Sequence, residues 1–282
     1  MLDVRARVIA VDEHPLPYFT LRLGVPAGYP AVAPGQFVMV QVGDRLEPYL
    51  RRAFSVYDIG DGEDAGGSPS ARLDGRAAPA VDAPGGVEMR LLGKVIGRGT
   101  RLLGASRPGD EVGVLGPLGR GFGARTAGRV AVVAGGVGSA ALLLLARRLA
   151  TGDPFDVFYG GRSRRDLPDA DRFEELAEAS GGELYATTED GSAGRRGLVT
   201  EPLRERLAGG FYAHLYACGP MGLLARLAAL CAEHGVPGEA ALETAMGCGF
   251  GACLGCAVPH VAGHYALCCK DGPVFRFDEV AW

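Results

Sequence analysis

The stretch Val130-Ala-Val-Val-Ala-Gly-Gly-Val-Gly-Ser-Ala140 decides the fold of the larger part of this chain. It starts as an uninterrupted apolar run, which is typical of a buried strand, and it ends in glycines where a helix is expected to begin. Glycines at this place let the backbone approach a pyrophosphate closely. Because the full G-x-G-x-x-G pattern is missing, a plain tight turn is the alternative interpretation of Gly135, Gly136 and Gly138.

From Arg129 onward the chain alternates between strand, turn and helix. Parallel strands need crossover connections, so this alternation predicts a doubly wound α/β domain with helices on both faces of a parallel sheet. The expected strands are Val130–Ala134, Phe155–Tyr159, Leu184–Thr188 and His214–Ala217, and the expected helices are one that ends near Ala150, Asp169–Ala179, Val199–Leu207 and Met221–His234.

The last of these strands ends in a second motif, Tyr216-Ala-Cys-Gly-Pro-Met221. The motif lies at the carboxyl edge of the predicted sheet, where open α/β sheets place their ligands. The thiol of Cys218 would lie near a reactive ring bound there. The alternative is a buried cysteine ahead of a helix that opens with proline.

The chain before Arg129 indicates short strands separated by turns. Phe19, Leu21, Leu23 and Val25 alternate with Thr20, Arg22 and Gly24, and an apolar run, 37–42, follows the turn signal Pro34-Gly35. This pattern predicts an antiparallel β-barrel. Further elements are expected at Met89–Ile96 (strand), Gly97–Ser106 (short helix) and Glu111–Leu115 (strand), and the Gly-, Ala- and Pro-rich segment Gly60–Gly86 is expected to be a mobile loop.

Two motifs in this first domain suit one dinucleotide. Arg52-Ala-Phe-Ser55 offers a guanidinium that can grip a diphosphate and a hydroxyl that can donate to a flavin ring nitrogen. Gly97-Arg-Gly-Thr100 opens a short helix, where free N–H groups favour a phosphate. Taken singly, each motif also has an ordinary interpretation: a surface arginine with a strand serine, and glycines selected for packing.

The strongest chemical signal is Met246-Gly-Cys-Gly-Phe-Gly-Ala-Cys-Leu-Gly-Cys256, which spaces three cysteines as C-x4-C-x2-C, the spacing of plant-type [2Fe-2S] loops. The loop glycines allow positive φ, so that amide N–H groups can point at bridging sulfides. Cys268 or Cys269 is the fourth ligand. A structural zinc site, reduced free thiols and disulfides are the alternatives, and zinc more often uses two C-x2-C knuckles.

Composition limits the classes of function. A chain of 282 residues, 48% hydrophobic and 22% charged, can bury two sizeable cores. A net charge of -4 lacks the basic excess of a nucleic-acid binder. The charged N-terminal stretch has no signal-peptide h-region, and the apolar segment Val130–Leu149 is interrupted by glycines and arginines, so we expect a soluble cytoplasmic protein without membrane contact.

In this order the motifs resemble the ferredoxin–NADP reductase superfamily, which has P-G-Q-F and R-x-x-S in a flavin barrel and G-G-x-G and C-G-P in a nicotinamide domain. With the cysteine module added, nearly the whole chain resembles the electron-transfer subunits of type B dihydroorotate dehydrogenase. The matching segments are Arg52-Ala-Phe-Ser55, Gly97-Arg-Gly-Thr100, Leu115-Gly-Pro-Leu-Gly119, Thr188-Glu-Asp-Gly-Ser192 and Cys269-Lys-Asp-Gly-Pro-Val-Phe275. The chain departs from that family by its insertion after Asp58 and by Ala53, where proline is usual.

The resemblance implies three parts: an FAD-binding β-barrel domain at 1–124, an NAD-binding α/β domain at 125–237 and a [2Fe-2S] module at 238–282. It also implies the residues that hold each cofactor. FAD would be held by Arg52, Ala53, Phe54, Ser55, Leu92, Gly93, Lys94, Gly99 and Thr100; NAD by Gly135, Gly136, Gly138, Cys218 and Gly219; and the cluster by Cys248, Cys253, Cys256 and Cys269. Cys269 is selected over Cys268 because the family's fourth ligand precedes an acidic-Gly-Pro segment.

The implied function is electron transfer by an oxidoreductase subunit between NAD(H), FAD, the cluster and a partner subunit. That partner would carry FMN and oxidise dihydroorotate in pyrimidine biosynthesis, in a heterotetramer with two copies of each chain. No acid or base is required, because the cofactors carry the chemistry. NAD is expected from the family, although Arg162, Arg164 and Arg165 would either pair with a 2′-phosphate or form a solvated loop. The alternatives are the NAD(P)H-flavin subunit of a hydrogenase, sulfide dehydrogenase or transhydrogenase-type complex, and a redox sensor without turnover.

Overall fold

The computed structural model describes residues 1–42, 48–60, 86–123 and 127–282. The chain forms two compact units, one made of Met1–Val32 and Phe37–Pro117 and the other of Ala33–Gln36 and Leu118–Trp282. The loop predicted to be mobile, Gly60–Gly86, falls almost entirely on residues 61–85, which lie outside the described residues. In the described part of the chain, the helices are all too short or too polar to cross a membrane.

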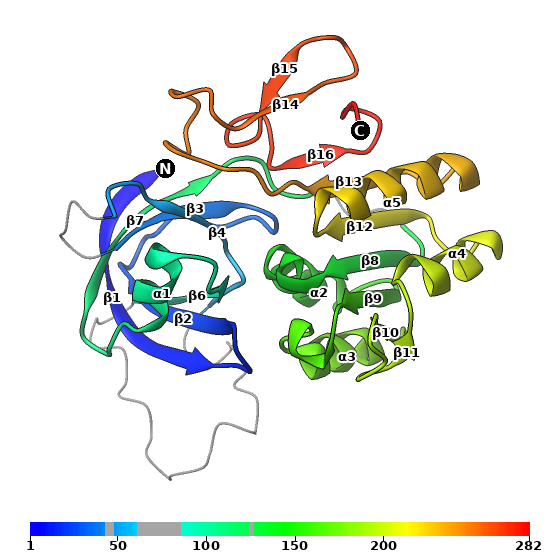
Figure 1. Cartoon of the computed structure of the whole chain (residues 1–282), viewed down its shortest axis with the longest axis horizontal. Helices are drawn as coiled ribbons and strands as arrows, with labels where there is room; N and C mark the ends of the chain where they lie inside the picture. The colour runs from blue at the N-terminus through cyan, green and yellow to red at the C-terminus, as the bar shows by residue number, and fades with distance from the viewer. Residues whose placement is uncertain (43–47, 61–85, 124–126) are drawn as a thin grey trace. The chain divides into compact units, whose positions relative to one another are not determined.

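The described residues of the first unit form a curled antiparallel sheet and one short helix (Figure 1). Its strands are β1 (Leu2–Glu13), β2 (Tyr18–Val25), β3 (Phe37–Gln41), β4 (Arg52–Ser55), β5 (Asp58–Gly60), β6 (Val87–Lys94) and β7 (Glu111–Leu118), in the order β4-β3-β7-β1-β2-β6-β5. The edge strand β4 also contacts β6 near the other edge, so the sheet curls on itself. Helix α1 (Arg98–Gly104) packs on β2 and β6.

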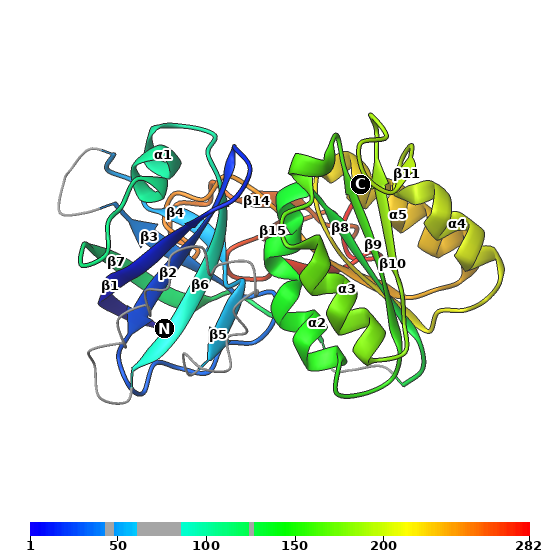
Figure 2. The ribbon, with the colours of Figure 1, turned by 90° about the horizontal axis from the view of Figure 1, so that it is seen from below.

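The second unit is a sheet of seven strands in the order β11-β10-β9-β8-β12-β13-β16. Its elements up to residue 234 are β8 (Val130–Gly135), α2 (Leu143–Leu149), β9 (Phe155–Gly161), α3 (Ala170–Ala179), β10 (Leu184–Thr188), β11 (Arg195–Arg196), α4 (Thr200–Ala208), β12 (His214–Cys218) and α5 (Met221–His234). Figure 2 shows α2 and α3 on one face and α4 and α5 on the other. The strands expected from the alternation are therefore present and parallel.

One expected helix is divided. The segment after β8 was predicted to be a single helix to about Ala150, but it forms a 3-10 turn, η2 (Gly136–Ala141), before α2 begins at Leu143. Gly136 has φ 54°, which an α-helix does not accommodate, and Gly138 lies tightly against the loop after β12. The glycines thus shape a turn and delay the helix.

The chain after residue 237 contributes strands that the sequence analysis did not predict. β13 (Gly238–Ala241) pairs in parallel with β12, and β16 (Val274–Arg276) pairs antiparallel with β13. β14 (Ala257–Pro259) and β15 (Tyr265–Leu267) form a separate hairpin. Strands of three or four residues are too short to show a hydrophobic period, so these elements escape recognition in the sequence.

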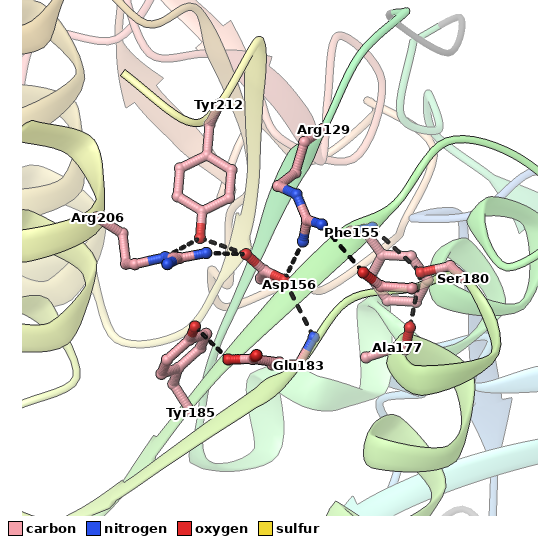
Figure 3. Close-up of polar contacts among 10 residues, drawn as sticks. Arg129, Phe155, Asp156, Ala177, Ser180, Glu183, Tyr185, Arg206 and Tyr212 are labelled. Carbon is pink, nitrogen blue, oxygen red and sulfur yellow. Dashed lines mark hydrogen bonds and ion pairs between the residues drawn. The ribbon is translucent and has the colours of Figure 1, made fainter. Parts of the chain in front are cut away.

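The amino ends of the parallel strands are held together by one buried carboxylate (Figure 3). Asp156 on β9 is fully buried and accepts hydrogen bonds from Arg129 Nη1 at 2.6 Å and Tyr212 Oη at 2.7 Å. It also accepts hydrogen bonds from Arg206 Nη2 at 3.3 Å and from the backbone N–H of Glu183 at 3.0 Å. Arg129 precedes β8, Glu183 follows α3, and Arg206 and Tyr212 lie near the end of α4 and beyond it. The network therefore joins these elements at the amino end of the sheet.

Candidate functional site

The four predicted cluster cysteines lie in two pairs. Cys256 Sγ and Cys269 Sγ are 3.2 Å apart, and the backbone N–H of Cys253 donates to Cys248 Sγ at 3.4 Å. All seven cysteines are free thiols. Within the described ranges, no three His, Cys, Asp or Glu side chains converge as a single metal ion requires. Two thiol pairs suit a [2Fe-2S] cluster, in which four cysteines are shared by two irons, better than a four-thiolate zinc site.

The structure separates the two candidates for the fourth ligand. The backbone N–H of Cys269 donates to Cys256 Sγ at 3.4 Å, whereas the thiol of Cys268 is directed to the carbonyl oxygen of Leu242 at 3.4 Å. Burial, with Cys256 close by, raises the pKa of Cys269 to about 12. A metal cation has to displace protons from such thiols, which couples binding to pH. The position of the Cys269 thiol beside Cys256 therefore favours Cys269 over Cys268 as the fourth ligand.

The loop backbone prepares Cys248 for negative charge. Burial opposes ionisation of this thiol, but hydrogen bonds from the backbone N–H groups of Phe250 and Cys253 lower its pKa to about 6. The turn depends on Gly249 and Gly251, whose φ values are 86° and 90°. Gly247 and Gly255 were also expected to use positive φ, but they lie outside the left-handed region.

The two motifs predicted separately for the nucleotide pack against each other in the second unit. β8 and β12 are adjacent, with Ala134 opposite Cys218. A Cβ atom on Gly138 would lie 2.3 Å from the carbonyl oxygen of Cys218, and one on Gly135 would lie 3.0 Å from Pro220 Cδ. Only glycine permits this approach at the carboxyl edge of the sheet, where α/β proteins bind ligands.

A buried hydroxyl marks this edge as a binding site. Ser139 follows the glycines, is fully buried, and its Oγ has no hydrogen-bond partner among the described residues. Buried polar groups are nearly always satisfied, so an unpaired hydroxyl points to a missing ligand or water. The glycine cradle together with Ser139 fits a dinucleotide. Ser139 is not among the predicted site residues, although it lies directly beside the motif.

Cys218 is a neutral thiol beside a carboxylate. Burial raises its pKa well above the usual value, and the nearby Glu243 raises it further; Cys218 Sγ lies 3.9 Å from Glu243 Oε1. A thiol held in this form has no role as a base, in agreement with chemistry that needs none. Glu243 is not among the predicted site residues. Its available signal was an acidic residue between an apolar segment and the cysteine loop.

The predicted FAD motifs also meet, in the first unit. Arg52 is on β4, and a Cβ atom on Gly99 would lie 2.2 Å from Arg52 Nε, so the guanidinium rests against the start of α1. Thr100 Oγ1 accepts hydrogen bonds from the backbone N–H groups of Ile96 at 3.0 Å and Gly97 at 3.2 Å, which fixes this turn. A guanidinium beside helix N–H groups fits an anionic diphosphate.

The other residues predicted to contact FAD lie on β4 and β6, and several of them pack against aromatic rings. A Cβ atom on Gly93 would lie 2.5 Å from the ring of Phe19, and Phe54 meets the same ring edge-on at 6.5 Å. Leu92 is buried, and Lys94 Nζ lies 5.0 Å from the ring centre of Tyr18. Ala53 is exposed, and Ser55 pairs with Phe37 across β3 and β4.

Known proteins share this arrangement. Residues 243–281 match the family described as the iron-sulfur cluster binding domain of dihydroorotate dehydrogenase B, and residues 132–228 match the oxidoreductase NAD-binding domain. The chain is 37% identical over 255 residues to the dihydroorotate dehydrogenase B (NAD(+)) electron transfer subunit of Desulforamulus reducens, an alignment that covers 88% of this chain and 87% of that protein. The chain belongs to this family of electron transfer subunits.

Further relatives agree with this membership in the electron transfer subunit family. A homologue of the subunit from Aquifex aeolicus is 35% identical over 250 residues, covering 88% of this chain and 86% of that protein. A chain of the NADH-dependent reduced ferredoxin-NADP oxidoreductase superposes with a TM-score of 0.79 at 27% identity, covering 98% of this chain and 90% of that one. The chain is thus an oxidoreductase subunit, and the predicted fold class of flavin-type barrel, parallel-sheet NAD domain and C-terminal iron-sulfur module is confirmed.

Proposed function

We propose that this chain carries electrons between NAD(H) and a partner subunit that contains FMN and oxidises dihydroorotate to orotate. The observation that supports this most is the pairing of four thiols on the loop 246–256 and at Cys269, in a chain that also holds a glycine cradle for a dinucleotide. Bound FAD and a bound [2Fe-2S] cluster would convert a two-electron hydride into single electrons, and NAD would be the co-substrate.

The residues of the chain bind the cofactors, orient them and neutralise their negative charge. Arg52 and the start of α1 offer positive charge to the FAD diphosphate, and Gly135, Gly136, Gly138 and Gly219 let the backbone approach the NAD pyrophosphate. Cys218, a buried and uncharged thiol, would lie near the nicotinamide. Cys248, Cys253, Cys256 and Cys269 are the proposed cluster ligands.

We further propose the division into 1–124 for FAD, 125–237 for NAD and 238–282 for the cluster, a heterotetramer with two copies of each subunit, and a cytoplasmic location. The family name, electron transfer subunit, supports the existence of a catalytic partner. Size measurement of the co-purified complex tests the stoichiometry.

The test of the function is Cys253→Ser in the complex with the partner. We expect loss of the cluster's visible absorption and of NADH-to-orotate electron exchange, while NADH still bleaches the flavin. Cys231→Ser, in helix α5 and remote in sequence from the cluster loop, is the matched control and should retain both activities. If NADH-to-orotate electron exchange remained intact in Cys253→Ser, the cluster would not lie on the electron-transfer route.

A transhydrogenase-type complex is the second candidate function, because the solved chain with a TM-score of 0.79 comes from a ferredoxin-NADP oxidoreductase. The identity of the subunit that co-purifies, followed by a dihydroorotate-dependent assay, distinguishes the two. Orotate formation supports the first candidate, and reduction of a ferredoxin without it supports the second.

A further inference from the structure

Three arginines directly after β9 have no anionic partner among the described residues. Arg162, Arg164 and Arg165 are exposed, and no described residue lies within hydrogen-bond or ion-pair distance of their guanidinium groups. Other arginines of the same unit are engaged: Arg129 contacts Asp156 at 2.6 Å, and Arg195 contacts Glu205 at 2.8 Å. In the part of the chain that the structure describes, these three guanidinium groups are therefore not engaged in ion pairs.

The backbone of this segment is held in place without those side chains. The N–H of Glu189 donates to the carbonyl oxygen of Gly161 at 3.1 Å, and the N–H of Asp190 donates to that of Arg162 at 3.1 Å. The N–H of Arg164 donates to Ser192 Oγ at 2.7 Å. The turn after β10 thus fixes the position of the arginines, and their side chains remain available for a ligand.

The arginines also lie at the edge that the nucleotide motif occupies. β9 is next to β8, and Gly160 is opposite Gly135, so the arginine segment leaves the sheet at the level of the glycine cradle. In dinucleotide-binding α/β domains an acidic residue in this region binds the ribose 2′-hydroxyl, whereas an arginine nearby accommodates a 2′-phosphate. Here the first carboxylate after Gly161 is that of Asp166, and its Oδ2 accepts a hydrogen bond from Ser163 Oγ at 3.3 Å.

We propose that Arg162, Arg164 and Arg165 bind the 2′-phosphate of NADPH, so that this chain accepts electrons from NADPH as well as from NADH. The inference rests on the proposed function and extends its co-substrate. In the added reaction NADPH loses a hydride from nicotinamide C4 to the flavin and becomes NADP+; the two electrons then follow the same route as those from NADH. The neighbouring carboxylates are those of Glu189 and Asp190, and Asp190 Oδ1 is already occupied by Ser192.

Binding of nucleotide fragments to the holoprotein tests the site directly. Adenosine 2′,5′-bisphosphate and 5′-AMP differ only in the 2′-phosphate, and the 3′,5′ isomer carries the same charge in the wrong place. By calorimetry we expect the 2′,5′ compound to bind about tenfold more tightly than 5′-AMP, as charge-assisted contacts allow, and more tightly than the 3′,5′ isomer. Equal affinity for the 2′,5′ compound and 5′-AMP would refute the proposal, as would equal affinity for the two bisphosphates, which would indicate unspecific charge attraction.

Substitution assigns the effect to the arginines. In the triple variant Arg162→Gln, Arg164→Gln and Arg165→Gln, the affinity ratio of the 2′,5′ compound to 5′-AMP should fall about tenfold, with the NADPH-to-NADH ratio of flavin bleaching falling in parallel. Arg148→Gln, an exposed arginine in α2, removes one positive charge elsewhere, as each single variant does, and should leave both ratios unaltered. If the triple variant does not fold, the three single variants replace it.

The two proposals fail in different ways. If NADH bleaches the flavin but NADPH does not, the 2′-phosphate site is wrong and the proposed function stands. If both nucleotides bleach the flavin but no electrons reach the partner, the proposed function is wrong and the 2′-phosphate site stands.

Discussion

The two ends of the parallel sheet in the second unit are built in opposite ways. At the amino end, the buried Asp156 is surrounded by donors from Arg129, Arg206 and Tyr212 (Figure 3). At the carboxyl end, the strands run out into glycines, and the buried hydroxyl of Ser139 has no partner among the described residues. At the amino end the chain itself surrounds the buried carboxylate with donors, whereas the carboxyl end leaves groups for a ligand.

This difference follows from what each end has to do. A buried charge is tolerated only when hydrogen bonds and opposite charges surround it, and such a network rigidifies the elements that contribute to it. A site for a pyrophosphate needs the reverse: side chains are absent so that backbone N–H groups can reach the ligand. The contrast implies that substitutions at the amino end should change stability, and those at the carboxyl end should change nucleotide binding.

The largest expected effect is that of Asp156→Ala. Removing the carboxylate leaves two guanidiniums and a phenol without their common acceptor, so the free energy of unfolding should fall by about 3–5 kcal/mol. Denaturant unfolding measures this loss. Glu205→Ala removes the exposed partner of Arg195 and serves as the control, with an expected loss below about 1 kcal/mol.

The folded fraction of Asp156→Ala should bind NADH as the parent protein does. A loss of stability no larger than that of Glu205→Ala, or a weakened NADH affinity in the folded protein, would remove the distinction between the two ends.

A smaller effect on stability and a larger one on binding are expected for Gly138→Ala. The added Cβ would lie 2.3 Å from the carbonyl oxygen of Cys218, so the turn has to shift, at a cost of about 1–3 kcal/mol. Titration of flavin bleaching with NADH should show a weakened affinity. Gly222→Ala in helix α5, where an added Cβ meets nothing within 4 Å, is the control and should be neutral or slightly stabilising. Unchanged NADH affinity in Gly138→Ala would place the dinucleotide elsewhere.

The smallest expected effect is a pH dependence at the amino end of the sheet. Glu239 on β13 lies 3.7 Å from His214 Nε2 and accepts a hydrogen bond from the N–H of Gly123 at 3.0 Å. Burial raises its pKa, but these two partners outweigh burial and lower it below the ordinary value. A carboxyl with a lowered pKa stabilises the fold above its unfolded pKa, about 4.3, and this contribution is lost as the pH falls through the folded value.

Glu239→Gln should therefore be less stable than the parent protein at pH 7 by about 1 kcal/mol, as expected for one hydrogen bond to a charged group. The difference should shrink as the pH falls below about 4. Unfolding midpoints measured across this range check the prediction. A difference that is constant with pH would mean that Glu239 contributes only through packing.

How far the sequence predicted the structure depended on the length of the pattern. The strand Leu184–Thr188 and the helix Met221–His234 were predicted with their observed bounds, and the helix, with 14 residues, is long enough to show its period clearly. The strands β5, β13 and β16 were not predicted, since three or four residues carry no period and are ordered by their neighbours. Cys248, Cys253 and Cys256 were selected from local spacing, whereas Glu243 and Ser139, which belong to no spacing pattern, were not.

The sequence by itself determined the order of the parts, because apolar periodicity, glycine turns and cysteine spacing are local properties of the chain. The tertiary structure decided which distant residues meet. It brought the thiol of Cys269 rather than that of Cys268 to the thiol of Cys256, laid Arg52 against Gly99, and packed Gly138 on Cys218. Such contacts depend on strand register and on the close approach of two backbones, which residues far apart in the sequence do not record.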